Sequence, residues 1–234
     1  MAVVQQRGRI RLLDPETGAI DSVDFLAISG LAAGGEQGLL GLAFAPDFQE
    51  SGEFYVNLTV EGTGRTEIRR YQSMSGRRDM GDPATADVIL AIDQPRSNHN
   101  AGWIGFAPDG LLLVPTGDGG GGGDPFGNAQ DSSALLGKIL RLDISADSFP
   151  TDPERDYAIP PGNAFANAAD GAPEIYALGL RNPFQSTIDP ASGDLIIADV
   201  GQGQREEINR LSLTDGAGTN FGWNVREGTV AFTG

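Results

Sequence analysis

The sequence predicts an all-β protein built from repeated hairpins, and three observations support this prediction. The 234 residues include 34 glycines and 14 prolines, which favour tight turns over helices. Three segments share one pattern: a short apolar strand, a turn containing Pro and Asp, and a returning strand. Each hairpin is followed by a segment in which apolar and polar residues alternate. The hairpins begin at Leu42, Ile104 and Ser186, and the alternating segments at Thr66, Gly137 and Glu206.

The repeating unit is therefore a hairpin plus an outer strand, which is typical of a propeller blade. The turn prolines Pro46, Pro108 and Pro190 are unevenly spaced, so the repeat accepts long insertions. A blade buries its faces only against neighbouring blades, and a closed ring removes free edges. We expect residues 1–234 to form a single partial β-propeller domain, an arc rather than a ring. The alternative is a compact β-sandwich of about ten strands.

Two short segments carry the only helical signal in the sequence. They are "DSSALLGKI" from Asp131 and "NAFANAAD" from Asn163, and each is long enough for one or two turns. Both lie in the long insertions between predicted strands.

The charge balance excludes two classes of partner. The chain has 32 acidic and 16 basic residues, a formal net charge of −16, with Lys138 as the single lysine. Such a surface repels phosphate backbones and anionic lipids, so we expect neither nucleic acid nor membrane partners.

Cysteine is absent, which excludes disulfides and thiolate metal sites. The N-terminal stretch lacks the pattern of a signal peptide and no segment reaches the length of a membrane span, so the chain as written is expected to stay where it is made.

The single histidine, His99, is the first candidate for chemistry, because an imidazole is the usual general base near neutral pH. Pairing of residues 102–107 with 111–117 across a turn at Asp109 returns the chain, which brings Asp118 near His99. A carboxylate there orients the ring and fixes its tautomer. The alternatives are that His99 is a solvated loop residue and that Asp118 ends a strand or binds loop amides.

Five glycines, residues 119–123, follow Asp118 and allow close backbone approach to a ligand. The run lacks the Gly-Lys-Ser/Thr of a phosphate-binding loop and opens no helix, so it matches no nucleotide fingerprint. A flexible surface loop is the alternative.

Polar residues recur where the other predicted hairpins begin and end. Equivalent points of successive blades gather at one end of a propeller axis, which predicts a shared mouth for these side chains and His99. The residues expected at this mouth are Gln37, His99, Asp118, Arg181, Asn182 and Gly201, and Gln202 follows Gly201 at the end of the third hairpin.

Six motifs occur in an order that resembles the soluble PQQ-dependent sugar dehydrogenases, the glucose/sorbosone dehydrogenase family. The resemblance implies a six-bladed β-propeller, of which this chain covers roughly four blades. It also implies pyrroloquinoline quinone (PQQ) and Ca²⁺ as cofactors, an aldose sugar as substrate and an unidentified electron acceptor. The motifs are "EQGLLGLAFAPDF", "NHNAGWIGFAPDG", "LLGKILRLD", "IYALGLRNPF", "DVGQGQREEIN" and "NFGWNV".

The same resemblance implies roles for individual residues. His99 corresponds to the base that takes the proton of the anomeric hydroxyl, and Asp118 to the aspartate that orients it. Arg181, with Asn182 beside it, corresponds to the arginine next to the quinone carbonyl. Gln37 corresponds to a glutamine that lines the cofactor site. Gly201 and Gln202 correspond to the turn whose main-chain carbonyls hold Ca²⁺.

The chain departs from the family pattern at its end. The family's cationic residues that clamp the quinone carboxylates come from later blades, and this sequence stops at Gly234. We therefore expect a pocket lined on one side, with weak or no activity.

The family implies a periplasmic or secreted location. Two alternative functions are a non-catalytic propeller that binds a protein or glycan, as hedgehog-interacting relatives do, and a calcium-dependent lactonase.

Overall fold

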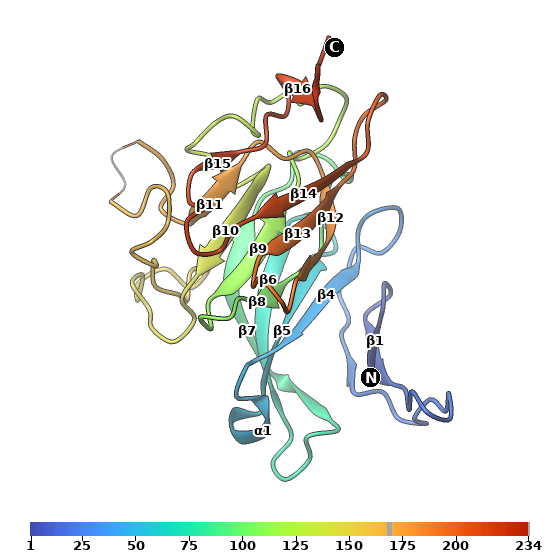
Figure 1. The fold of residues 1–234 in the computed structure, drawn as a ribbon. Coiled ribbons are helices and arrows are strands. Elements are labelled where there is room, and N and C mark those ends of the chain that lie inside the picture. Colours follow the sequence, from blue (N-terminus) through green and yellow to red (C-terminus); the bar gives the residue numbers. More distant parts are fainter. Residues whose placement is uncertain (168–169, 234) are drawn as a thin grey trace.

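The computed structural model describes residues 1–167 and 170–233 and shows an almost entirely β protein. Its strands form five separate sheets that succeed one another along the chain (Figure 1). Within the described residues no sheet closes on itself, which confirms the predicted incomplete ring. None of the helices in this part of the chain is long and apolar enough to cross a membrane.

Three sheets contain the predicted units of a hairpin followed by an outer strand, and we call them the first, second and third blades. The first blade consists of β4 (Leu39–Phe44), β5 (Glu53–Thr59), β6 (Thr66–Ser73) and β7 (Gly81–Ile92). The second consists of β8 (Gly105–Phe106), β9 (Leu112–Thr116), β10 (Lys138–Leu142) and β11 (Ile175–Leu178), with β15 (Thr219–Asn220) parallel to β11. The third consists of β12 (Pro183–Ile188), β13 (Leu195–Asp199) and β14 (Glu207–Leu211).

Two smaller sheets flank the blades. The N-terminal sheet is β1 (Ala2–Gln5), β2 (Arg9–Leu12) and β3 (Leu26–Ala27). The C-terminal hairpin is β16 (Arg226–Glu227) and β17 (Val230–Ala231).

The second hairpin pairs over a shorter stretch than the sequence predicts. Only Gly105 and Phe106 pair with β9, although pairing was expected from residue 102. Ala101 and Gly102 have φ angles of 53° and 140°, a conformation that strands do not adopt. The chain therefore bends at this point, and pairing begins after the bend.

The one helix among residues 1–167 and 170–233, α1 (Phe48–Ser51), was not predicted. It is one turn long, closes the first hairpin, and ends at Gly52 in the left-handed conformation with φ 77°. The two segments with helical signal form turns instead, and Lys138 already belongs to β10. Ala168 and Ala169 of the second segment lie outside the described residues.

The core lies between the sheets rather than within one of them, as expected of stacked blades. On β5, Phe54 and Val56 pack against the N-terminal sheet, whereas Tyr55 packs toward the second blade. On β9, Leu112 faces the first blade and Leu113 faces the third. This alternation buries both faces of each central sheet. It argues against the sandwich alternative and fixes how the strand ends meet.

Candidate functional site

His99 and Asp118 form a buried pair where β9 leaves the second blade. His99 Nδ1 and Asp118 Oδ1 lie 2.6 Å apart, and His99 is only 4% exposed. His99 has a φ of 58°, which is uncommon for a residue with a side chain. Gly117 makes the approach possible, because a Cβ there would lie 1.9 Å from the carbonyl oxygen of His99. The contact predicted from the hairpin return is therefore present.

Asp118 is held by more donors than the imidazole. Trp223 Nε1 donates to Oδ2 at 2.8 Å, and the backbone N–H of Gly120 donates to Oδ1 at 2.8 Å. A carboxylate satisfied in this way accepts the Nδ1 proton of His99 and leaves the lone pair on Nε2. Among the described residues no hydrogen bond uses Nε2 of His99. The pair therefore has a buried, oriented imidazole with one ring nitrogen unused among the described hydrogen bonds.

Sequence reasoning missed the role of Trp223. The residue belongs to "NFGWNV", which contributed to the family resemblance, but it received no function there. Its indole N–H reaches a carboxylate 105 positions earlier in the chain. No local spacing predicts such a contact.

A second carboxylate, Glu36, joins the first and third blades to the histidine. Its Oε2 accepts the backbone N–H of His99 at 2.6 Å and Nδ2 of Asn182 at 3.1 Å. Asn182 in turn accepts the backbone N–H of Ala101 at 3.0 Å through Oδ1. These bonds hold the backbone of His99 and Ala101, which both have left-handed φ values.

Gln37, which the resemblance selected, lies apart from this cluster. Its backbone exchanges hydrogen bonds of 3.1 Å with Gly34, and its side-chain amide lies beside Gly64. The neighbouring Glu36 reaches the histidine instead. Glu36 and Gln37 are neighbours in the same motif, and only the course of the backbone shows which of the two side chains reaches the cluster around His99.

Arg181 and Asn182 begin the third blade and are fixed by Asp199 at the end of β13. Asp199 accepts the backbone N–H groups of Arg181 at 3.0 Å and Asn182 at 2.6 Å. Burial raises the pKa of Asp199 to about 7, although these two bonds oppose the rise.

The Arg181 guanidinium has unused donors. One nitrogen, Nη1, donates to the carbonyl of Val200 at 2.9 Å, and the group lies 5.6 Å from the centre of the Trp223 ring. Its Nε is buried and has no hydrogen-bond partner within residues 1–167 and 170–233. A buried cationic donor of this kind suits an anionic ligand.

The glycine run packs closely rather than forming a flexible surface loop. Gly120 has a φ of 94°, and a Cβ there would lie 2.4 Å from Oδ1 of Asn98. The backbone N–H of Gly123 donates to Oε1 of Gln202 at 2.5 Å. The run therefore connects the segment before His99 to the turn that contains Gly201 and Gln202.

That turn presents backbone oxygens rather than side-chain ligands. Among the described hydrogen bonds, none ends on the carbonyls of Gly201, Gln202 or Gly203. In the same part of the chain no three His, Cys, Asp or Glu side chains group as a metal site. A cation held here would depend on main-chain oxygens.

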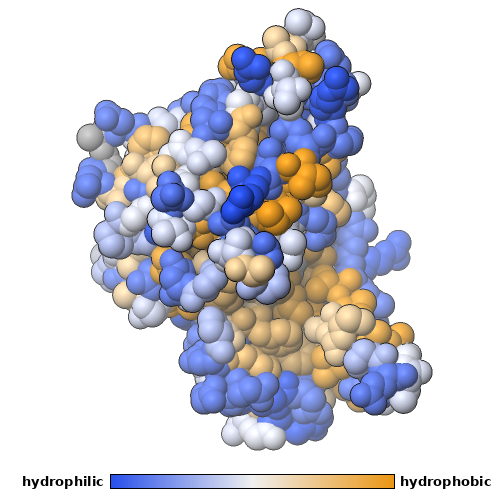
Figure 2. Space-filling model, viewed as in Figure 1, coloured by the Kyte–Doolittle hydropathy of each residue, from blue (hydrophilic) through white to orange (hydrophobic). Residues whose placement is uncertain are grey.

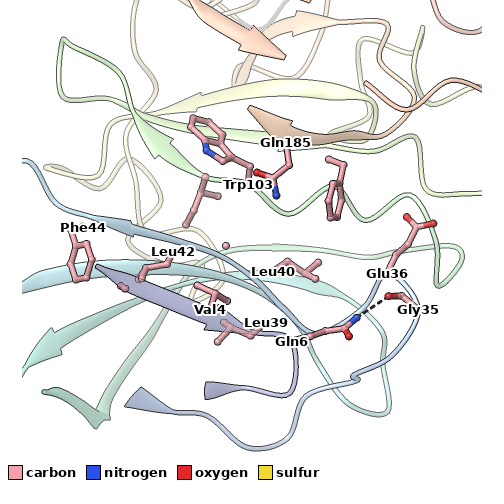
Figure 3. Close-up of a pocket in the computed structure, with 14 residues that line it drawn as sticks. Val4, Gln6, Gly35, Glu36, Leu39, Leu40, Leu42, Phe44, Trp103 and Gln185 are labelled. Carbon is pink, nitrogen blue, oxygen red and sulfur yellow. Dashed lines mark hydrogen bonds between the residues drawn. The ribbon is translucent and has the colours of Figure 1, made fainter. Parts of the chain in front are cut away.

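A cleft of about 720 Å³ adjoins this cluster but does not contain it. It lies between β1, β4 and β12, and its labelled lining is mainly apolar, with Glu36 at one end (Figure 3). Figure 2 shows apolar surface gathered in a hollow on the side of β4, whereas most of the visible surface is hydrophilic. Neither His99 nor Asp118 lines the cleft, and Glu36, which accepts the backbone N–H of His99, connects the two.

Comparison with known proteins identifies the class that this fold and site define. The structure aligns with the PQQ-bound aldose sugar dehydrogenase of Streptomyces coelicolor, with a TM-score of 0.74, 27% identity and coverage of 97% of this chain and 60% of that one. The fold is therefore the propeller-type fold of these proteins. The glucose/sorbosone dehydrogenase family model matches residues 1–234, and the chain belongs to this family.

Other relatives extend the comparison. An oxidoreductase of Thermus thermophilus assigned as a glucose dehydrogenase aligns with a TM-score of 0.76 and 32% identity, over 98% of this chain and 62% of that one. HIPL1 protein of Arabidopsis thaliana is 32% identical over 97% of this chain and 38% of its own length. Human Hedgehog-interacting protein is 30% identical over 83% of this chain and 29% of its own length. The chain thus spans well under half of these two curated relatives.

Proposed function

We propose that this chain carries the catalytic face of a PQQ- and Ca²⁺-dependent dehydrogenase that oxidises an aldose to its lactone. The observation that carries the proposal is the buried His99–Asp118 pair, in which no described hydrogen bond uses Nε2 of His99. The pair is linked to the Arg181 guanidinium through Trp223, which donates to Asp118 and lies under the guanidinium. Family membership and the likeness to a PQQ-bound sugar dehydrogenase support it. A periplasmic or secreted location is part of the same proposal.

The residues present fit both cofactors. PQQ is a planar polyanionic quinone, and the unpaired Nε of Arg181 is a donor for its oxygens, with Asn182 and His99 nearby. Ca²⁺ prefers oxygen ligands, and the free carbonyls of Gly201 and Gln202 are such ligands. When bound, PQQ supplies the acceptor for a hydride and Ca²⁺ acts as a Lewis acid.

The chain's own residues then account for the proton. Nε2 of His99 accepts the proton of the anomeric hydroxyl as the hydride leaves C1, so the sugar loses two electrons and becomes the lactone. Asp118 keeps the ring in the required tautomer and stabilises the imidazolium that forms. Glu36 and Asn182 hold the backbone of His99 and Ala101, which fixes the position of the ring.

Reconstitution tests the proposal. The purified chain is incubated with PQQ and Ca²⁺ and assayed for dye reduction with a panel of aldoses. We expect reduction that requires both cofactors and yields lactone. Absence of reduction with every sugar would contradict the enzyme proposal, and lactone hydrolysis without quinone would favour a lactonase.

A second candidate is a non-catalytic module that binds a protein or glycan. It is favoured by the 32% and 30% identity to HIPL1 protein and Hedgehog-interacting protein. Such a module has no need of the quinone. Calorimetric titration with PQQ separates the two, because a pure binding module gives no saturable heat.

A further inference from the structure

The exposed turn after β13, residues 201–205, is held from beneath by one buried carboxylate. Glu227 on β16 is only 1% exposed, whereas residues 202–205 are all exposed. Its Oε1 accepts the backbone N–H groups of four consecutive residues. They are Gln202 at 2.6 Å, Gly203 at 2.7 Å, Gln204 at 3.0 Å and Arg205 at 3.3 Å.

These four bonds fix the direction of the carbonyl groups in the turn. In a planar trans peptide unit the N–H and the C=O point in opposite directions. The peptide bonds of this turn are trans, so N–H groups that point at Glu227 turn the preceding carbonyls away from it. The carbonyls of Gly201, Gln202 and Gly203 therefore face away from Glu227, and they are the three without a described donor.

Glu227 also sets the charge behind the turn. The Glu227 carboxylate places a negative charge at the N–H side of the turn, where four backbone donors stabilise it. An ionised carboxylate at the N–H side of a peptide unit polarises that unit and makes its carbonyl oxygen more negative. A second carboxylate, Glu206, accepts the backbone N–H of Gly201 at 3.0 Å. Residues 202–206 line a hollow of about 220 Å³ at the surface.

We propose that Glu227 is the positioning residue for calcium: it does not touch the ion, but orients and polarises the carbonyls of Gly201, Gln202 and Gly203 that hold it. The inference rests on the proposed function, to which it adds a residue from β16. It explains why a glutamate is buried under an exposed, glycine-containing turn. It also assigns a third carbonyl, that of Gly203, to the site.

The test measures calcium binding at the carbonyls themselves. Backbone carbonyl ¹³C shifts of residues 201–203 are followed while Ca²⁺ is added into the millimolar range, without PQQ and then with it. The variants are Glu227→Gln, which removes the charge at nearly constant shape, and Glu227→Asp, which keeps the charge on a shorter side chain. Glu154→Gln is the matched control, because Glu154 is half-exposed and pairs with Arg65 of the first blade. Melting of each calcium-free protein monitors folding.

We expect the three carbonyls of the unmodified chain to shift saturably. The calcium midpoint should rise about 10- to 100-fold in Glu227→Gln, less in Glu227→Asp, and remain unchanged in Glu154→Gln. An equal midpoint in Glu227→Gln overturns the role of Glu227 and leaves the calcium site intact. If Ca²⁺ changes none of the three carbonyl ¹³C shifts of the unmodified chain, with or without PQQ, this result also contradicts the calcium site of the proposed function.

Discussion

The two ends of the blades are built differently, although the same strands connect them. At the turn end, polar groups bond within a few residues: Asp109 Oδ1 accepts the N–H of Leu111, and Asp189 Oδ1 accepts that of Ala191. At the mouth, Glu36 bonds to residues 63 and 146 positions away. The turn end therefore follows from local sequence, whereas the mouth exists only when the blades are stacked.

This difference predicts which substitutions alter the folding of the protein and which alter its chemistry. A turn whose hydrogen bonds are local forms early and tolerates change, because each bond depends on its own few residues. The mouth holds a left-handed histidine through bonds from Glu36, next to the first blade, and Asp118, next to the second. Such strain persists only when the surrounding structure enforces it. Changes at the mouth should alter chemistry more than folding, and changes at the turns the reverse.

The largest effect is expected at His99. The substitution His99→Asn removes the base, while asparagine accepts the left-handed backbone that position 99 requires. We expect the reconstituted turnover rate to fall about 10²- to 10⁴-fold, with the melting temperature nearly unchanged. Steady-state dye reduction measures the rate. Turnover equal to that of the unmodified chain would remove His99 from the chemistry.

Asp118→Asn should have the next largest effect. The amide favours the wrong tautomer by donating to Nδ1, which places the proton on Nε2 and blocks its function as a base. We expect turnover to fall on the order of 10²-fold while KM for the sugar changes little. Parallel losses in KM and in melting temperature would instead assign Asp118 a purely structural role.

Lys138 holds together the loop of residues 128–136 in the second blade, and its loss should lower the stability of the protein. This fully buried lysine donates from Nζ to the carbonyls of Asn128 at 2.6 Å and Leu136 at 2.7 Å. Lys138→Met leaves buried carbonyls without a donor, for which we expect a loss of about 1–3 kcal/mol in the free energy of unfolding at pH 7. Urea denaturation measures it. An unchanged midpoint would contradict this role.

The same lysine predicts a pH dependence. Burial lowers the pKa of Lys138 to about 8, from an ordinary value of 10.5. Between these values the unfolded chain binds more protons than the folded one, so the free energy of unfolding rises with pH, by at most about 1.4 kcal/mol per unit. Urea denaturation at pH 8, 9 and 10 should show the rise in the unmodified chain and not in Lys138→Met. Equal slopes would contradict the assignment.

The smallest effect is expected at the turn end. Asp189→Ala removes a side chain that bonds to Ala191 N–H and, at 2.8 Å, to the hydroxyl of Ser192. We expect the melting temperature to fall by no more than about 3 °C, with PQQ binding unchanged. Circular dichroism and calorimetry measure the two quantities. Weakened PQQ binding would show that the two ends are coupled after all.

The same distinction explains what the sequence could predict. The three hairpins with their outer strands were predicted correctly, because turn residues and alternation are local signals. The His99–Asp118 contact was also within reach, since a single hairpin brings the two together. The contacts of Glu36 and Trp223 could not be predicted in this way, because their hydrogen bonds join segments that belong to different sheets. Only the stacking of blades, which no short window of sequence encodes, brings them to His99.

The most direct test of the central claim, that the mouth is a quinone site, is calorimetric titration of the chain with PQQ in the presence of Ca²⁺. The account predicts saturable heat that is strongly reduced in Arg181→Ala and retained in Asp189→Ala. A folded, unmodified chain that gives no saturable heat would contradict it.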